Sequence, residues 1–341
     1  MSWLIWRTYR AQAVATGAVL AAFAALVIIT GMQMASQWHS AVVTCTASHS
    51  CGNLSSTLFL GSRTVGFLVI MTLGVPAVLG MLCGAPLVAQ EVEAGTSQFA
   101  WTQSITRRRW LAVKAGWLLL AAVCVCGVVS GLVTWWSGPN NALQANAFAP
   151  GRFDIMGIVP VGYAVFAMAL GIAAGALLRR TLPAVGLTLA GFIAVRFVVF
   201  GWVRPHLMSA VTTYFPLNVG FTPAGSFWQL AAGYVGADGQ PITIPQSTNG
   251  QVLGAAGGDI PVSSLPAPCQ ALAGGGNARR LSPAARDAVL SCAQAHHIRA
   301  FLTYQPAGRY WAFQGIETGL FVLLAAALIA VTFAVVSRRD A

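Results

Sequence analysis

Charged side chains are scarce in this chain, and acidic ones are the scarcest. Only 8% of its 341 residues are charged, and Asp and Glu together number 8, whereas soluble domains carry roughly 25% charged residues. With 57% hydrophobic residues, the chain cannot keep a folded surface in water, so lipid is its main solvent. Paired membrane carboxylates of the kind that proton relays use are also missing.

Catalytic motifs are missing as well. The sequence has no G-x-x-x-x-G-K-[ST] phosphate loop, no H-E-x-x-H and no G-x-S-x-G. We therefore assign no catalytic residue, no metal site and no cofactor to this chain. The net charge of +11 does not indicate nucleic acid, because the arginines stand in small groups beside hydrophobic runs, as topology control requires.

Six hydrophobic runs are long enough to cross about 30 Å of hydrocarbon as helices. They are Ala13–Met34, Thr64–Val88, Trp110–Trp136, Ile155–Leu178, Leu182–Val203 and Ile316–Val336. The first run is too long for a typical signal peptide and is expected to be retained. The sequence thus predicts an all-α polytopic membrane protein with six transmembrane helices.

The positive residues are concentrated at one set of helix ends. They are Arg7, Arg10, Arg107, Arg108, Arg109, Lys114, Arg179, Arg180, Arg338 and Arg339. The opposite short loops carry only Arg63 and Arg152. Because cytoplasmic ends hold the excess of Arg and Lys, both termini, the segment Val88–Lys114 and the Arg179–Arg180 turn are predicted to be cytoplasmic. We expect a transmembrane domain at residues 1–203, an extracellular insertion at 204–315 and the last helix at 316–341.

The insertion has a different composition from the rest of the chain. It is rich in Gly, Pro, Ser and Asn, with turn signals such as Asp238-Gly239. Its apolar first part, His206–Tyr234, is expected to be re-entrant or to pack on the outer membrane face. Ser282–Ala295 is predicted to be a helix, with Ser282 as the N-cap and Pro283 in the first turn. We expect a small ordered cap and no separate enzyme domain.

Four of the 7 cysteines lie in predicted outer segments. An oxidising compartment favours disulfides there, and we expect the pairs Cys45–Cys51 and Cys269–Cys292, although four cysteines allow three connectivities. The other three, Cys83, Cys124 and Cys126, lie in predicted helices and are interpreted as packing residues.

Three charged residues lie in or beside the predicted bilayer. Arg196 is inside the fifth helix, while Asp154 and Glu317 start the fourth and sixth helices at the outer side. A membrane charge is costly and usually has a partner or a wet cavity. Arg196 is therefore expected to snorkel outward or to pair with Asp154 or Glu317. Two interpretations stay open: a structural role as an ion pair or a snorkelling arginine, which we favour, and a polar element of an outer gate or substrate path.

Small residues recur four apart at Gly80/Gly84, Gly127/Gly131 and Gly171/Gly175. This spacing is typical of helices that approach one another closely, within a bundle or across a dimer.

The segment Val88–Lys114 is the most polar short region between two predicted helices. It contains Glu91 and Glu93, then an amphipathic stretch in which Phe99 and Trp101 stand among polar residues, then three consecutive arginines. Such a stretch can lie along the membrane face and offer one side to a partner, with the arginines at the anionic inner leaflet. An ordinary inner loop is the alternative, but the whole pattern favours a docking element.

Two motifs in this segment resemble the ABC-2 type family of ABC transporter permeases. They are the E-x-E-x-G-T element of Glu91, Glu93, Gly95 and Thr96, and A-W-T-Q-S-x-T-R-R-R-W at Ala100–Trp110, which is similar to an actinobacterial branch. The predicted topology resembles the family too. Only the long insertion, with its expected disulfide, departs from the family's usual short re-entrant hairpin.

The resemblance implies a permease subunit of an ATP-driven exporter in the bacterial plasma membrane. A coupling helix at about 89–109 would seat in a separate ABC ATPase subunit, present in two copies, which holds the ATP and Mg. The implied coupling residues are Glu91, Glu93, Gly95, Thr96, Phe99 and Trp101. Two permease subunits would pair, with a homodimer favoured over a heterodimer. The substrate would be amphipathic or hydrophobic: a drug, an antibiotic, a lipid or a related compound.

Two other functions compete with an exporter permease. A non-transporting membrane sensor or scaffold would use the outer insertion as a ligand-binding module. A membrane-embedded enzyme would need clustered acids, bases or nucleophiles, which the sequence lacks. The sequence does not identify the substrate.

Overall fold

The structure of this chain is a computed structural model, and it forms two compact units. The first joins Met1–Arg204 to Trp311–Ala341, and the second is Pro205–Tyr310. Residues not described are 1–13, 15–16, 19–20, 34, 38, 41–42, 44–61, 94–106, 145–147, 149–150, 218–222, 224–226, 237, 243–264, 273–281 and 339–341.

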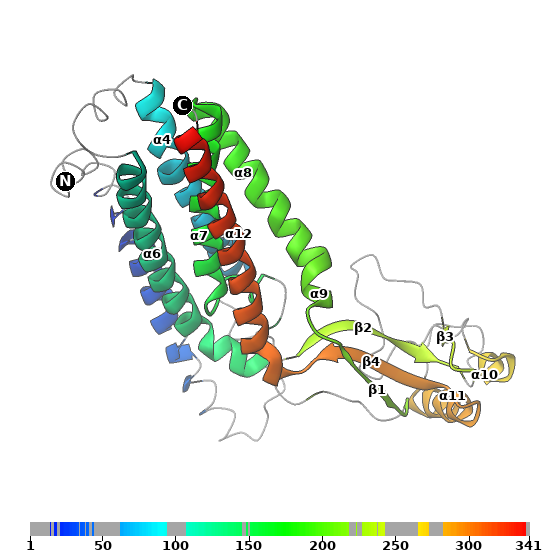
Figure 1. Cartoon of the computed structure of the whole chain (residues 1–341). Helices are drawn as coiled ribbons and strands as arrows, with labels where there is room; N and C mark the ends of the chain where they lie inside the picture. Colours follow the sequence, from blue (N-terminus) through cyan, green and yellow to red (C-terminus); the bar gives the residue numbers. More distant parts are fainter. Residues whose placement is uncertain are drawn as a thin grey trace. The chain divides into compact units, whose positions relative to one another are not determined.

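Long apolar helices make up the described part of the first unit (Figure 1). They are α3 (Ser62–Leu79), η1 (Gly80–Gly84), α4 (Ala85–Glu93), α6 (Arg107–Gln144), α7 (Val159–Leu178), α8 (Thr181–Val198), η2 (Val199–Val203), α9 (Arg204–His206) and α12 (Tyr310–Arg338). The backbone stays helical on both sides of the π-helical turns η1 and η2. Helix α3 therefore continues into α4, and α8 continues into α9.

Five of these segments are long and apolar enough to cross a membrane. They are Val69–Glu91, Arg108–Gly138, Val159–Leu178, Thr181–His206 and Ala307–Ser337. They confirm a polytopic helical membrane protein and correspond to the second to sixth predicted helices. The first predicted helix overlaps a shorter apolar helix, Ala21–Gln37, so the six-span topology stays a prediction.

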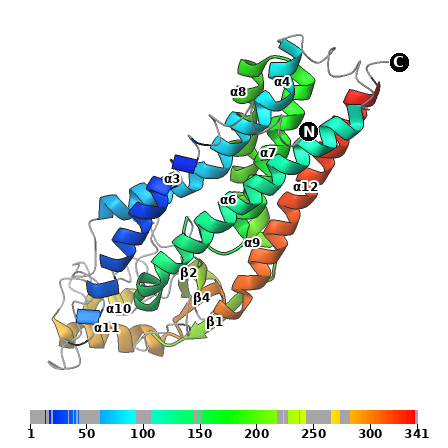
Figure 2. The same ribbon diagram turned by 90° about the vertical axis from the view of Figure 1, so that its left-hand side faces the viewer.

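Helix α7 is the central helix of this unit (Figure 2). Its spanning window is 72% buried, against 17–39% for the other four spans. It packs against α3, η1, α4, α6 and α8. Because α7 is apolar on all sides and rich in Ala and Gly, neighbours can approach it from every direction. It ends at Arg179, whose left-handed φ of 53° makes the tight turn into α8.

Glycines allow the closest helix approach in the unit, as the small-residue spacing predicted. A Cβ on Gly171 would lie 2.4 Å from the carbonyl oxygen of Gly80, and a Cβ on Gly175 would lie 2.4 Å from that of Ala85. These are backbone atoms, which cannot rotate aside. A Cβ on Gly127 or Gly131 would meet no described atom within 4 Å, so within this unit their spacing is not used for packing.

The second unit corrects the expectation of an all-α fold. It contains a four-stranded antiparallel sheet in the order β1-β4-β2-β3, formed by β1 (Val211–Phe215), β2 (Trp228–Val235), β3 (Pro241–Ile242) and β4 (Arg299–Gln305). The segment His206–Tyr234, which was expected to be re-entrant or to pack on the outer membrane face, carries β1 and most of β2. Its β-branched and aromatic residues, as in VTTYF, favour a half-buried strand.

Two helices pack with this sheet around a small core. They are α10 (Ala267–Leu272) and α11 (Pro283–Ala295), and the 3₁₀ turn η5 (Ala307–Arg309) follows β4. The predicted helix and its cap are confirmed, since Ser282 Oγ accepts a hydrogen bond from the Ala285 amide at 3.3 Å. The core contains Val289 of α11, Tyr234 of β2 and Leu302 of β4. The Cys269–Cys292 disulfide joins α10 to α11, as predicted.

Substitution of Gly171 tests the close approach at α7. Gly171→Ala places a methyl group against backbone atoms of η1 and α4, and overpacking of this kind lowers the free energy of unfolding by about 1–3 kcal/mol. Gly127→Ala, which meets open space, serves as the matched control and leaves the stability unchanged or slightly raised. Thermal unfolding of the purified protein in detergent compares the two; equal melting temperatures would contradict the packing.

The disulfide makes a separate prediction for the second unit. Cys269→Ala, which opens the loop, lowers the stability of that unit by about 3 kcal/mol on the chain-entropy estimate. Limited proteolysis of the sheet unit under oxidising conditions measures the change. Cys124→Ala, which removes an exposed thiol of α6, is the control and leaves the proteolysis rate of the sheet unit unchanged. Reductant accelerates cleavage of the wild type to the rate of Cys269→Ala, and an unaffected wild type contradicts the bond.

Candidate functional site

The main candidate site is a buried ion cluster in the first unit, at the end of the bundle away from the α7–α8 turn. Arg204 is its centre. Its guanidinium donates to both oxygens of Glu317, from Nε to Oε2 and from Nη2 to Oε1, each at 2.7 Å. Nη2 also forms an ion pair with Asp154. Arg204, Asp154 and Glu317 are 3%, 5% and 0% exposed, so the pairing is almost free of solvent.

Arg196 and Tyr163 complete the cluster. Arg196 Nη2 lies 3.1 Å from Asp154 Oδ2, so of the expected alternatives, snorkelling or pairing with Asp154 or Glu317, the structure shows the pair with Asp154. The Tyr163 hydroxyl contacts both carboxylates, at 2.5 Å from Glu317 Oε1 and 3.1 Å from Asp154 Oδ1. The Arg196 guanidinium lies over the Tyr163 ring at 4.0 Å. Two arginines thus face two carboxylates, and the formal charges cancel.

Sequence reasoning missed Arg204, because it was placed in the insertion that follows the fifth helix. Arg196 and Arg204 are 8 residues apart, which puts them about 80° apart around a regular α-helix. The π-helical turn Val199–Val203 lies between them and takes up one extra residue. That turn brings the two side chains to within about 20° of one face. Arg204 could have been found only by extending the helix beyond its apolar run.

Buried polar groups fix the loop that carries Asp154. The Gln314 amide oxygen accepts from the backbone N–H groups of Ile158 and Val159, both at 3.0 Å. Its nitrogen donates to the carbonyls of Phe153 and Met156, at 3.1 and 3.2 Å. A side chain of α12 therefore caps the N-terminus of α7, which is otherwise without a side-chain cap. This saturated amide holds Asp154 beside the arginines.

The second candidate site is the end of α4, where the predicted coupling segment begins. Glu91 forms an ion pair with Lys114 of α6, and the Lys114 ammonium lies 4.4 Å from the centre of the Trp110 ring. Glu91 and Lys114 stand on opposite sides of residues 94–106 in the sequence. The ion pair therefore holds together the two helices that flank this segment.

Glu93 contacts a different helix. Its carboxylate accepts two hydrogen bonds from Thr181, one from the backbone N–H at 3.0 Å and one from the hydroxyl at 2.5 Å. The hydroxyl bond, then the backbone bond, lower the pKa of Glu93. The carboxylate is consequently charged at neutral pH, and its stabilisation of α8 is lost only as the pH falls through that lowered pKa.

Four predicted coupling residues, Gly95, Thr96, Phe99 and Trp101, lie outside the described residues, as do Cys45 and Cys51. Their roles and the Cys45–Cys51 pairing stay predictions. The structure brings Asp154, Arg196 and Glu317 together at one site, and it places Glu91 and Glu93 at another.

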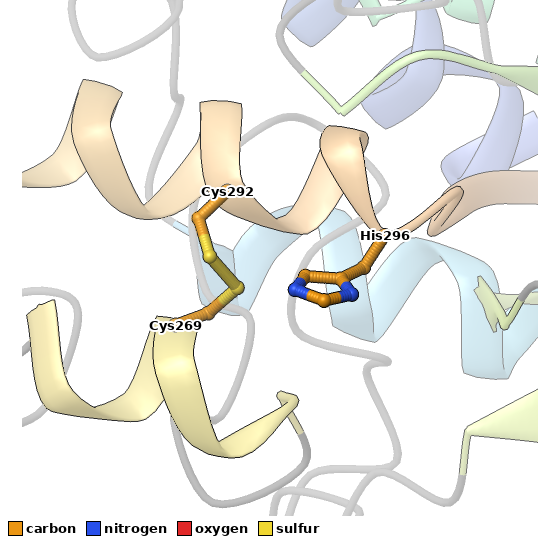
Figure 3. Close-up of side chains that lie close together, drawn as sticks. All are labelled: Cys269, Cys292 and His296. Atoms are coloured by element: carbon orange, nitrogen blue, oxygen red, sulfur yellow. A yellow bond between two sulfur atoms is a disulfide. The ribbon is translucent and has the colours of Figure 1, made fainter.

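A third cluster lies in the second unit. The sulfur atoms of Cys269 and Cys292 and a ring nitrogen of His296 lie within 4.8 Å of one another (Figure 3). Cys292 and His296 are four residues apart, so they lie on the same side at the C-terminal end of α11. Metals bind cysteine as the thiolate. Since the two sulfur atoms are joined in a disulfide, they are not thiolate ligands in this form.

These helices and polar clusters define a multi-pass membrane protein. Residues 17–204 match the family described as ABC-2 membrane transporter related, and the chain belongs to this family. The family consists of membrane subunits, generally non-enzymatic, that typically work with an ATPase subunit. Neither a curated protein nor a solved structure matches the chain.

Removal of Arg204 tests the ion cluster. Arg204→Met leaves buried Glu317 without its cation, and breaking a buried pair in this way costs about 3–5 kcal/mol. The double variant Arg204→Met/Glu317→Gln removes the unpaired charge as well and recovers part of the loss. Arg109→Ala, at an exposed arginine of α6, is the control and changes little. Thermal unfolding in detergent ranks the four proteins; a double variant less stable than Arg204→Met contradicts the role of charge pairing.

Proposed function

We propose that this chain is the permease subunit of an ATP-driven exporter of the ABC-2 type. The observation that carries the proposal is the family match over residues 17–204, which includes the predicted coupling segment. The five apolar spans support it. The chain also has no phosphate loop, so ATP and Mg would be bound by a separate ATPase subunit.

The topology in this proposal has six spans, with both termini and Val88–Lys114 in the cytoplasm of a bacterium. The arginine-rich ends support this orientation, and so does the tight Arg179–Arg180 turn, which belongs to the same set of ends. The second unit would then be extracellular. Its Cys269–Cys292 disulfide fits an oxidising compartment. We also propose that the chain belongs to an actinobacterial branch of the family, on the motif at Ala100–Trp110.

The coupling segment in this proposal includes Gly95, Thr96, Phe99 and Trp101, with Phe99 and Trp101 as the apolar anchors in a groove of the ATPase. Aromatic side chains are the usual anchors of protein interfaces. Glu91 would act by holding the flanking helices together through Lys114, so that a displacement of the segment moves α4 and α6 together.

A hydrophobic or amphipathic substrate suits the membrane face of this unit. A pocket of about 230 Å³ lies between the Ala21–Gln37 helix and α6, lined by Phe23, Ala24, Cys124, Val125, Val128, Val129 and Leu132. No described lining residue carries a charge. Such a pocket would accept an apolar group directly from the bilayer. Export is the direction that the family resemblance implies, and a homodimer with two ATPase subunits is the proposed assembly.

Binding of an ATPase through the coupling segment tests this function. The chain is co-expressed with the ABC ATPases of the same genome and the complex is purified. Trp101→Ala and Phe99→Ala each remove an interface anchor and weaken ATPase binding by about 10- to 30-fold. The matched control is Trp117→Ala, at an exposed tryptophan of α6 within the apolar span, which leaves ATPase binding unchanged.

Transport completes the test. Reconstituted complex should accumulate an apolar dye in vesicles with ATP and not with ADP, and Trp101→Ala should abolish this accumulation. A folded chain that binds no ATPase, or a complex that moves no compound while its second unit binds a ligand, would contradict the exporter and favour a membrane sensor.

A further inference from the structure

Helix α8 and its continuation α9 carry residues of both candidate sites. Its first residue, Thr181, is bound by Glu93 at the end of α4. Its other end carries Arg196 and, after η2, Arg204 of the ion cluster. We propose that Glu93 is a positioning residue: it fastens α8 to the end of α4, so that movement of the coupling segment is transmitted through α8 to the Asp154–Glu317 ion cluster. This inference rests on the proposed function.

The contact at Thr181 is a helix cap supplied from another helix. The first N–H groups of an α-helix have no partner within it, and negative charge is favourable there. Arg180, the N-cap residue of α8, supplies no side-chain cap. Glu93 fills that position with two hydrogen bonds to one residue, which fixes both the distance and the direction of the approach. A helix end held in this way follows the carboxylate when α4 moves.

The body of α8 is suited to transmit such a movement. Thr181–His206 is one continuous helical segment, about 35 Å long from Thr181 to Arg204. Near its beginning, Ala184 is fully buried against Ala85 of α4 and Ala174 of α7. Small residues at this contact let α4 and α8 lie close together, and close packing resists relative sliding. The cap and the packing therefore act on the same end of α8.

The far end of α8 meets groups from two other elements. Arg196 pairs with Asp154, which precedes α7, and Arg204 pairs with Glu317 of α12. An ion pair in a low-dielectric site is strong only at short range and with good geometry. A displacement of α8 along its axis would therefore break or exchange these pairs as discrete steps. The two sites are coupled by the helix that connects them.

Glu91, two residues before Glu93, provides the contrast. Its partner Lys114 lies on α6, on the other side of the coupling segment, so it joins the two flanks of that segment. Glu93 is the residue that accepts both hydrogen bonds from Thr181 of α8. The two carboxylates consequently have different effects: loss of Glu93 separates α8 from the segment without opening the contact between α4 and α6.

Variants of the cap test the proposal in the complex with its ATPase. Glu93→Ala removes both hydrogen bonds, Thr181→Val removes only the hydroxyl bond, and Thr181→Ser keeps both. Loss of a cap of this kind corresponds to about a fivefold change in equilibrium. The fraction of complex that responds to trapped ATP should fall about fivefold in Glu93→Ala, less in Thr181→Val, and not at all in Thr181→Ser. Glu93→Ala/Thr181→Val should be no worse than Glu93→Ala, because both changes remove one contact.

The response is read at the far end of α8. Spin labels at Phe197→Cys on α8 and Leu323→Cys on α12, both exposed positions, report the distance between the helices that carry Arg204 and Glu317. The cysteines outside the Cys269–Cys292 disulfide are replaced by Ala in this background. ATPase binding and thermal stability are measured for the same variants. If Glu93 had only a structural role, its loss would lower ATPase binding or stability, and the distance change per bound ATPase would stay the same. Asp287→Ala, at an exposed acid of the second unit, is the control for loss of one carboxylate.

The outcomes separate this inference from the proposed function. If the labelled chain with intact Glu93 and Thr181 binds no ATPase or shows no ATP-dependent change in distance, the proposed function fails. If this labelled chain responds, and Glu93→Ala and Thr181→Val respond to the same extent, the exporter stands and the role of Glu93 is overturned. Selective loss of the response, with ATPase binding retained and Thr181→Ser normal, supports it.

Discussion

A charge inside a low-dielectric environment must be paired, and much of the first unit is arranged around this requirement. Arg204 is 3% exposed and Glu317 is completely buried, and a buried charge without a partner of opposite sign is costly. Their pairing fixes the end of α8 against α12. The Gln314 amide, which also belongs to α12, holds the loop that presents Asp154 to both arginines. The end of the bundle is thus specified by polar contacts in an otherwise apolar unit.

Close helix packing supplies the complementary constraint. Hydrophobic burial cannot drive helix association in lipid, so contact depends on small residues that let backbones approach. Gly171 and Gly175 of α7 meet the backbones of η1 and α4 at distances that no other residue allows. Nearby, Ala85 of α4, Ala174 of α7 and Ala184 of α8 pack together. These contacts place the end of α4, and with it Glu93, within reach of Thr181. Packing of small residues therefore determines which helix the end of α4 can contact.

The two polar sites and the helix between them form one connected set of contacts in the described part of the first unit. Glu91 joins the helices that flank residues 94–106, while Glu93 reaches past them to α8. An ATPase that acts on this segment would therefore act on α4, α6 and α8 together. The second unit, with its own core and disulfide, is a separate compact body in the insertion between α9 and α12.

The sequence alone determined the class of protein, because the length of the apolar runs and the scarcity of charge can be read directly from the residues. It also predicted the Cys269–Cys292 bond and the cap of α11, and it named Asp154 as one of the alternatives for Arg196, since each depends on short-range or strongly constrained chemistry. The sheet of the second unit was missed, because antiparallel pairing joins β1 to β4 across some 90 residues. The residues next to a strand in the sequence do not show which distant strand it pairs with. Arg204 and the Glu93–Thr181 cap were missed for a related reason. A π-helical turn and a close contact between α4 and α8 decide which side chains meet, and only the packed tertiary structure contains them.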